Sequence, residues 1–374
     1  MSSIVINATA ARSTGALSIL RDFIDYLSCD TYIAENEFHL FTCIDTFDTV
    51  VMKNRSTLTV HKVKVQSWFS RIMWDESGFR RYCRKSHINP DLIISMQNTC
   101  ANFPSVKQLV YYHQPLPLIR YRWNIFDKNE LILFMYSKFY GSFVNRNNAN
   151  ANYVVQLPFI RDLFLRKFRN VAEDRVVTIR PNTKQITTDT IDWKSLADSR
   201  FIFFYPSTDI SYKNHQVLIE ALCLLRKEAP SVLSHIKVFF TVSHLNKRLM
   251  KLLDEYDLRD TVTLLGLVPF SEILVYYNSV DALVFPSKIE TFGLPLVEAA
   301  SFGLPIVAAD LLYAREVLVD YPNTVFMDPS SPRQWGEMFR NCSSLKKTKV
   351  MLNTTTMNSW NLFLSHADKL IHMR

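Results

Sequence analysis

Short apolar runs alternate with stretches of helical spacing along this chain, in two successive series. The runs expected to be strands in the first series are 3–7, 38–43, 58–65, 92–95, 108–112 and 153–156. Those of the second series are 201–205, 236–242, 262–265, 282–285, 306–309 and 324–327. Strands that alternate with helices indicate a mostly parallel sheet with helices on both faces. The sequence therefore predicts an α/β protein.

A polar stretch that begins at Pro181 separates the two series and is typical of a linker. We predict two doubly wound, Rossmann-like domains, residues 1–180 and 181–356, which face each other across a cleft. Ligands of open α/β sheets bind beyond the carboxyl ends of the strands, so we expect the functional residues there. Helices expected between the strands include 15–27, 129–145, 212–228 and 295–302.

Composition narrows the class of protein. Hydrophobic residues make up 48% of the chain and charged residues 21%, which favours a globular fold over disorder. Only seven glycines occur, and neither GxGxxG nor GxxxxGK[ST] is present, so we expect phosphate to be bound by helix ends and cations. The six scattered cysteines predict reduced thiols in a cytoplasmic protein. We expect no signal peptide and no membrane-spanning run, hence a soluble protein or one peripheral to a membrane.

The segment 285–310 carries two glutamates, Glu290 and Glu298, with a turn between them. A strand precedes this turn, and a short helix starting near Pro295 and stopped by Gly303 follows it. The N-terminus of such a helix presents free N–H groups that bind anions. One acid can then hold sugar hydroxyls and the other ribose hydroxyls, with a diphosphate between them. The alternative without a function is that Glu290 and Glu298 are two surface carboxylates at the start of a helix.

More residues than the two glutamates carry the pattern. They are Pro286, Ser287, Glu290, Phe292, Gly293, Leu294, Pro295, Glu298, Ala299, Gly303, Pro305 and Ile306. This string resembles the E-x7-E signature of family 4 (group 1) glycosyltransferases, such as those of bacterial O-antigen and capsule biosynthesis. The resemblance implies a GT-B fold and transfer of a sugar from a nucleotide-diphosphate-sugar donor to a glycan acceptor, with retention of configuration. It also implies that no metal or other cofactor is needed.

The resemblance further implies roles for single residues. Glu290 would hold the sugar near the reacting centre, and Lys213, before a helix of the form LIEA, would neutralise the leaving diphosphate. His113, which follows a first-domain strand, would position the sugar. The remaining residues expected to bind the donor are Gly15, Ser207, Thr208, Gly266, Phe292, Gly293, Leu294 and Glu298.

Each of these roles has a simpler alternative. Ser207 and Thr208 stand where the family often has an arginine, so hydroxyl donors would replace a cation. Lys213 could be a solvated residue at a helix start, His113 could bond a loop carbonyl, and Gly15 could serve only a turn. A nucleotide-sugar epimerase, a phosphorylase or a non-catalytic scaffold on the same fold remain alternatives to the transferase.

Two further segments bear on partners. The amphipathic tail 357–374 is expected to pack back on the first domain, as a terminal helix does in the resembled family. Segment 66–85 mixes aromatic side chains with five Lys or Arg, a pattern that suits an anionic membrane surface and a lipid-linked acceptor of bacterial surface polysaccharide. An ordinary helix with a buried aromatic face and a wet basic face is the alternative. The absence of any nucleic-acid motif argues against nucleic acid as a partner.

Overall fold

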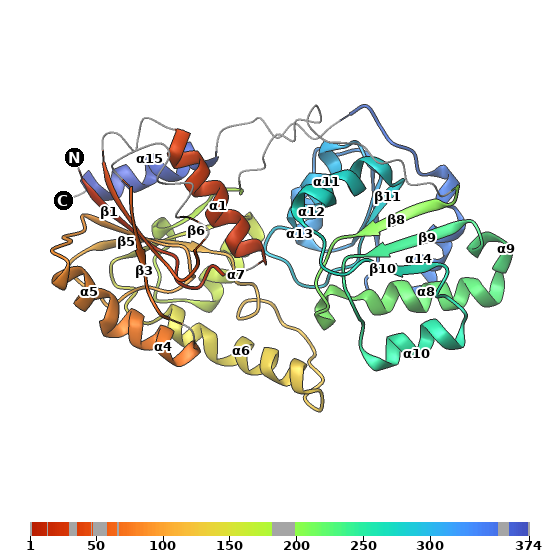
Figure 1. The fold of residues 1–374 in the computed structure, drawn as a ribbon, viewed down its shortest axis with the longest axis horizontal. Coiled ribbons are helices and arrows are strands. Elements are labelled where there is room, and N and C mark those ends of the chain that lie inside the picture. Colours follow the sequence, from red (N-terminus) through yellow and green to blue (C-terminus); the bar gives the residue numbers. More distant parts are fainter. Residues whose placement is uncertain are drawn as a thin grey trace. The chain divides into compact units, whose positions relative to one another are not determined.

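The computed structural model describes residues 2–12, 14–29, 36–45, 47, 58–65, 67–181, 199–350 and 359–372 (Figure 1). The chain divides into two compact units, Met1–Asn182 together with Met357–Arg374, and Thr183–Thr356. Each unit is built on its own parallel sheet with helices on both faces, so the predicted α/β class with two doubly wound halves is confirmed. The cleft between them stays a prediction. No helix in the described part of the chain is both long and apolar enough to cross a membrane.

The first sheet has seven strands in the order β3-β2-β1-β4-β5-β6-β7. Its strands are β1 (Ser3–Asn7), β2 (Glu37–Thr42), β3 (Leu58–Lys62), β4 (Leu92–Ser95), β5 (Lys107–Tyr112), β6 (Ala151–Val155) and β7 (Val176–Thr178). The central strands are apolar on both faces, as expected for a parallel sheet that is covered on both sides. The strand order reverses between β1 and β4, which places the switch point of this sheet there.

Two layers of helices cover the first sheet. In Figure 1, α1 (Thr14–Cys29) and α15 (Ser359–His372) lie on one side, and α4 (Trp68–Met73), α5 (Phe79–Lys85) and α6 (Lys128–Val144) lie on the other. The π-helical turn η1 (Trp74–Gly78) joins α4 to α5, and α7 (Pro158–Lys167) follows β6.

The tail helix α15 belongs to the first unit. Its Trp360 and Phe363 are buried in the same apolar cluster as Phe23 of α1, and the rings of Phe23 and Trp360 lie 4.6 Å apart. The indole Nε1 of Trp360 donates to Oδ2 of Asp22 at 2.7 Å. The last described helix thus completes the core around the first strands.

The second sheet has six strands in the order β10-β9-β8-β11-β12-β13. They are β8 (Phe201–Tyr205), β9 (Ile236–Phe240), β10 (Val262–Leu264), β11 (Ala282–Phe285), β12 (Ile306–Ala309) and β13 (Thr324–Met327). Phe203 packs on Phe339 of α14 (Pro332–Arg340), which lies beside α8 (His215–Glu228). Its neighbour Phe204 points to the opposite face and stacks on Tyr276 of α11 (Phe270–Ser279).

The start predicted for the helix over 212–228 is wrong. Residues Ser211–Lys213 form a 3-10 turn, Asn214 adopts a left-handed conformation (φ +63°), and α8 begins only at His215. Asparagine tolerates this conformation better than most residues. The side-chain amide of Asn214 also holds it there, because Nδ2 donates to the carbonyls of Pro286 and Pro329. Lys213 is therefore placed by a turn that is anchored to the neighbouring loop.

Candidate functional site

Two loops meet at the carboxyl ends of β8 and β11, the point where the order of the second sheet reverses. The first loop leads from β8 through Lys213 to α8, and the second leads from β11 through Glu290 to α12 (Leu294–Ser301). The backbone N–H of Lys288 donates to the carbonyl of Tyr212 at 2.8 Å, which ties the loops together. Chain segments far apart in sequence are thereby fixed at one edge of the sheet.

Lys213 and Glu290 form an ion pair across these loops. Nζ of Lys213 lies 2.5 Å from Oε1 of Glu290, and the two side chains are only 18% and 14% exposed. The hydroxyl of Tyr205 donates to the carbonyl of Lys213 at 2.7 Å and fixes the turn that carries it. The structure thus brings the predicted cation and the predicted acid together, and Lys213 is not a solvated lysine. An anionic ligand would have to compete with Glu290 for this cation.

The start of α12 lies directly after Glu290. Gly293 caps the helix with φ +87°, a conformation that favours glycine, and a Cβ there would come within 3.2 Å of Leu296. Within the described part of the chain, the N–H groups of Phe292, Gly293 and Leu294 donate to no protein acceptor. The three predicted backbone donors are therefore available to an anion at a helix N-terminus.

Glu298 lies in the second turn of α12 and is partly buried. The hydroxyl of Tyr277, on α11, donates to its Oε2 at 2.8 Å. Burial raises the pKa of Glu298 to about 7, and the hydrogen bond from Tyr277 opposes this rise. Small changes in its surroundings will therefore change its charge near neutral pH. Tyr277 was missed from the sequence, because nothing in the apolar helix pattern distinguishes it from a core tyrosine.

Ser207 is held by a network that the sequence did not reveal. Its N–H donates to Oγ1 of Thr241 at 2.9 Å, and the Thr241 hydroxyl donates back to the carbonyl of Ser207 at 3.1 Å. Oγ of Ser207 also lies 2.9 Å from Nε2 of His215. Burial lowers the pKa of His215 to about 3, with the charge of Lys213 acting in the same direction, so this imidazole is neutral. Thr208, the next residue, is exposed.

Gly266 follows β10 and has φ +79°. Its N–H donates to the carbonyl of Val242 at 3.2 Å, and a Cβ at this position would meet no atom within 4 Å. The backbone conformation thus explains the glycine, and close approach to a ligand is not required to account for it. Its predicted contact with the donor stays a prediction.

His113 and Gly15 belong to the first unit. The N–H of His113 donates to Oδ1 of Asn98 at 2.6 Å, while its buried Nδ1 has no hydrogen-bond partner among the described residues. Burial lowers the pKa of His113 to about 4, and a hydrogen bond with the backbone of Tyr111 opposes this shift, so the ring is neutral. Gly15 is the second residue of α1 and is exposed. Their approach to Glu290 stays a prediction.

Among the described residues, no group of three or more His, Cys, Asp or Glu side chains could hold a metal ion. The charges gathered at the carboxyl edge of the second sheet instead combine one lysine, two carboxyls and a helix start. This set suits a ligand that carries both an anion and hydroxyl groups.

Parts of this chain are similar in sequence to known glycosyltransferases. The family model described as "Glycosyl transferases group 1" matches residues 187–356. The O-antigen chain mannosyltransferase RfbU of Salmonella typhimurium is 31% identical over 97 residues, which are 26% of this chain and 27% of RfbU. The D-inositol 3-phosphate glycosyltransferase of Pseudarthrobacter chlorophenolicus is 30% identical over 129 residues, 34% of this chain and 30% of the relative. The chain thus matches less than a third of the length of these relatives.

Similar solved structures extend over both units. WaaG, a glycosyltransferase involved in lipopolysaccharide biosynthesis, superposes with a TM-score of 0.70 at 11% identity and covers 99% of this chain and 100% of its own. HepE of Anabaena, in complex with UDP-glucose, gives a TM-score of 0.69 at 16% identity with full coverage of both chains. At such identities the solved structures establish the fold, which is that of GT-B glycosyltransferases.

Proposed function

We propose that this protein is a retaining glycosyltransferase of the family 4 type, which moves a sugar from a nucleotide-diphosphate-sugar to a glycan acceptor. The observation that carries the proposal is the Lys213–Glu290 pair beside the open N-terminus of α12. The match of residues 187–356 to the group 1 family model supports it, because that stretch contains both residues and Glu298.

The donor would be held by groups of three kinds. Its diphosphate would accept hydrogen bonds from the N–H groups of Phe292, Gly293 and Leu294, and would draw Lys213 away from Glu290. The carboxylate of Glu290, released from the lysine, would accept from hydroxyls of the sugar. Glu298 would accept from the ribose hydroxyls, and the hydroxyls of Ser207 and Thr208 would face the phosphates. Each group thus matches one part of a nucleotide-diphosphate-sugar.

The chemical step needs charge stabilisation on the leaving group. As the bond from the anomeric carbon to the phosphate oxygen breaks, negative charge grows on the diphosphate, and Lys213 and the helix N–H groups would stabilise it. The acceptor hydroxyl forms the new bond to the anomeric carbon on the same face of the sugar, and its proton passes to an oxygen of the departing diphosphate. His113 would position the sugar. Because a lysine and backbone donors would supply the positive charge, we propose that the transfer needs no divalent metal.

The acceptor we propose is a lipid-linked intermediate of bacterial surface polysaccharide, such as O-antigen, lipopolysaccharide or capsule. RfbU is named for O-antigen chain synthesis and WaaG for lipopolysaccharide biosynthesis, and this is the support for the acceptor class. The protein would work in the cytoplasm at the inner face of the cell membrane, where segment 66–85 would contact anionic lipid.

Binding of nucleotides provides the first test. UDP, GDP and dTDP, with their common sugar conjugates, should be screened for thermal stabilisation of the wild type and of Glu298→Ala. A nucleotide at about a hundred times its dissociation constant adds roughly 2.7 kcal/mol to the free energy of unfolding. Glu337→Ala, on α14, provides a control of the same chemical change away from the site. We expect a shift with one base that Glu298→Ala reduces and Glu337→Ala keeps.

The alternative functions predict different results with the same purified protein. An epimerase would convert the donor with no acceptor present, and a phosphorylase would require free phosphate. A scaffold would bind no nucleotide at millimolar concentration, which would overturn the proposal. For the transferase, the anomeric configuration of the product, read by NMR, should equal that of the donor, and chelation of metals should leave the rate unchanged.

A further inference from the structure

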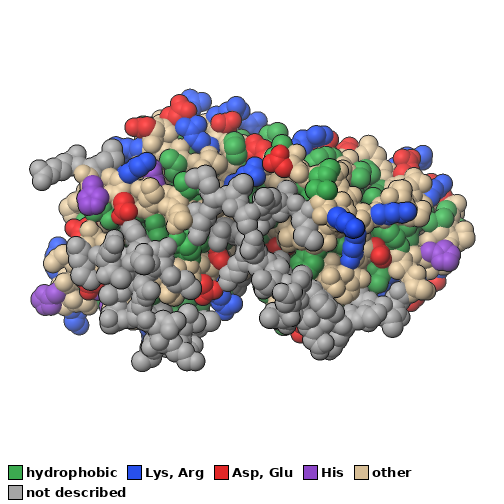
Figure 2. All heavy atoms as spheres, turned by 90° about the horizontal axis from the view of Figure 1, so that it is seen from above, with side chains coloured by type: hydrophobic (Ala, Val, Ile, Leu, Met, Phe, Trp, Pro, Cys, Tyr) green, Lys and Arg blue, Asp and Glu red, His purple; other side chains and the backbone are tan. Residues whose placement is uncertain are grey.

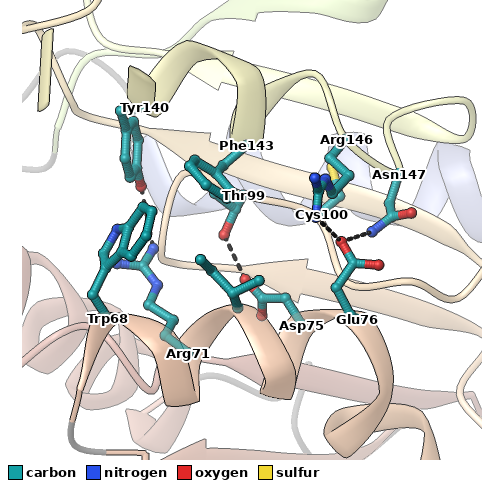
Figure 3. A pocket seen from close by; sticks show the side chains of 11 residues that line it. Trp68, Arg71, Asp75, Glu76, Thr99, Cys100, Tyr140, Phe143, Arg146 and Asn147 are labelled. Carbon is teal, nitrogen blue, oxygen red and sulfur yellow. Dashed lines mark hydrogen bonds and ion pairs between the residues drawn. The ribbon is translucent and has the colours of Figure 1, made fainter. Parts of the chain in front are cut away.

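Two charged side chains of the first unit point into its interior. Figure 2 shows Lys, Arg, Asp and Glu side chains spread over the face that it draws, which is where charges usually lie. Asp75 of η1 is buried, by contrast, and Arg71 of α4, about one helical turn before it, is partly buried (Figure 3). Taking a carboxyl out of water is unfavourable unless hydrogen-bond donors surround it. Burial of Asp75 therefore depends on the groups that donate to it.

Three side chains donate to the carboxyl of Asp75. Nε2 of Gln97 and Nδ2 of Asn7 donate to its Oδ1 at 2.7 and 3.4 Å, and Oγ1 of Thr99 donates to its Oδ2 at 2.9 Å. The amide of Asn7 can only turn this way, because its Oδ1 accepts at 3.3 Å from Nε1 of Trp74, and an indole nitrogen can only donate. Asn7 ends β1, while Gln97 and Thr99 follow β4. Asp75 thus joins the carboxyl ends of two strands at the switch point of the first sheet.

Gln97 has several partners in this network. Oγ1 of Thr9 donates to its Oε1 at 2.8 Å, which turns its NH2 group toward Asp75. Its carbonyl accepts from the guanidinium of Arg71 and, at 3.2 Å, from the hydroxyl of Tyr140 on α6. The side-chain amide and the carbonyl of Gln97 therefore both have partners, and four separate side chains fix this residue in place.

The loop that Asp75 holds also sets the position of His113. Asn98 lies between the two loop residues that donate to Asp75, is buried, and has φ +68°, a conformation that asparagine tolerates better than most residues. Its Oδ1 accepts at 2.6 Å from the N–H of His113, the first residue after β5. Burial lowers the pKa of His113 and the charge of Arg71 acts in the same direction, so these two side chains are within electrostatic reach. The hydrogen bond at Asn98 thus connects the buried carboxyl to the residue after β5.

We propose that Asp75 is a positioning residue for His113. Its hydrogen bonds hold loop 96–99, and Asn98 in that loop fixes the backbone from which the imidazole of His113 projects. The π-helical turn that carries Asp75 fits this role, because such turns are rare and frequently occur at functional sites. The step from the position of His113 to sugar transfer rests on the proposed function. The positioning itself does not, and every residue in it belongs to the first unit.

Matched variants of the full chain distinguish positioning from simple stabilisation of the core. Asp75→Leu removes both acceptor oxygens at nearly constant size. Asp75→Asn keeps an oxygen at the place of Oδ1, and the Thr99 hydroxyl can rotate to accept from the new NH2 group, so this variant should retain the network. Glu76→Leu makes a similar change at the next residue, whose carboxyl bonds instead to Arg146 and Asn147 (Figure 3). Thr99→Val, which removes one donor, replaces Asp75→Leu if that variant does not fold.

Amide exchange without any ligand, resolved by NMR for single residues, is the first measurement. In Asp75→Leu the N–H of His113 should exchange at least about tenfold faster than in the wild type, while that of Leu109, inside β5, should change by less than about twofold. Asp75→Asn and Glu76→Leu should leave both rates near those of the wild type. An equal rise at Leu109 and His113 would overturn the proposal, because it would show a general loss of stability. No rise at His113 in Asp75→Leu, or in Thr99→Val where that variant replaces it, would overturn it as well.

A double-variant cycle tests the step from the position of His113 to sugar transfer. Asp75→Leu should lower the transfer rate by about tenfold, since small displacements of a positioned group are costly, and by less than about twofold when His113→Ala is already present. Independent, multiplicative losses would overturn this step, and so would full activity of His113→Ala. A wild type that binds no nucleotide would overturn the proposed function, and the exchange rates, which need no nucleotide, would still decide whether Asp75 positions His113.

Discussion

Lys213 and Glu290 neutralise each other when no ligand is present, and this pairing sets what each can do when one binds. A carboxylate that is held by a lysine at 2.5 Å is a poor acceptor for a sugar hydroxyl. A diphosphate carries more negative charge than one carboxylate, so it competes well for the lysine. Binding of the diphosphate would therefore prepare Glu290 for the sugar.

The variant Glu290→Gln separates the effect of the ion pair on diphosphate binding from the role of Glu290 in sugar transfer. Without its competitor, Lys213 should bind free UDP, or whichever nucleoside diphosphate the protein selects, as tightly as in the wild type or more tightly. Sugar transfer should fall about 10²- to 10³-fold, the usual cost of losing one group that stabilises a transition state. Isothermal titration calorimetry measures the affinity for the nucleoside diphosphate, and a transfer assay measures the rate of sugar transfer. A tenfold weaker diphosphate affinity would contradict this account, and Glu272→Gln, a peripheral glutamate of α11, is the control.

Glu298 should make nucleotide binding depend on pH. Its pKa of about 7 leaves the carboxyl mostly neutral at pH 6 and mostly ionised at pH 8. Ribose hydroxyls donate to the ionised form, so the association constant should rise by roughly tenfold between these two values. Calorimetry at pH 6, 7 and 8 checks this. In Glu298→Gln only the titration of the phosphate itself should remain, and an equally steep rise in that variant would assign the effect to another group.

At the scale of single elements, the start of α12 depends on the conformation of one residue. Gly293→Ala should destabilise the second unit by about 1–2 kcal/mol, because an L-residue is strained at φ +87° and because Leu296 must move. Gly15→Ala is the matched control, since nothing lies within 4 Å of its added Cβ and alanine favours the helix. Urea denaturation compares them. A stability loss of equal size in both variants would show that the turn before α12 is not strained.

The paired strands β2 and β3 carry a histidine pair that should weaken the first unit in acid. Nδ1 of His39 lies 3.1 Å from Nε2 of His61, with Glu37 and Tyr82 beside them. Burial lowers the pKa of both rings, so the folded chain binds fewer protons than the unfolded chain. The two histidines therefore do not weaken the first unit above about pH 6.5. Its free energy of unfolding decreases as the pH falls below this value.

Urea midpoints measured between pH 7.5 and pH 5.5 test this expectation. His61→Phe keeps the stacking on Phe41 and removes one titrating ring, so it should flatten the dependence. His87→Asn removes an exposed histidine at a position with φ +55° that asparagine tolerates, and it should leave the slope unchanged. A slope that is the same in all three proteins would place the acid sensitivity elsewhere.

For the whole molecule, two separate cores imply that a ligand can protect one unit without the other. The backbone donors, Lys213 and both glutamates lie in the second unit. Hydrogen exchange with and without the selected nucleotide should therefore slow β8, β11 and α12 more than β1 and β2. Equal protection of β1 and β2 would contradict this expectation, because the contacts predicted for His113 and Gly15 are local and would not stabilise the whole first unit.

The sequence predicted the fold well where apolar runs are bounded by polar residues. Strands 92–95, 201–205, 282–285, 306–309 and 324–327 have the predicted ends. The prediction failed where side-chain hydrogen bonds set the backbone conformation. At Asn214, hydrogen bonds from the side-chain amide hold a left-handed turn, which the periodicity of the sequence does not indicate. In the site, the sequence named Lys213, Glu290 and Glu298. It missed Tyr277, Thr241 and His215, because a residue that acts through a neighbour's hydrogen bond leaves no local pattern.

Helix α15 has a consequence for how the protein is made. Its residues 359–372 are the last of the described chain to be synthesised, yet they fill the core around β1 and α1, which are made first. On the ribosome the second unit has all of its strands before the first unit has its final helix, and domains generally fold as they emerge. The amino-terminal half is thus translated first and finished last. Until α15 has been synthesised and has packed, the core that it shares with β4 and α1 stays incomplete.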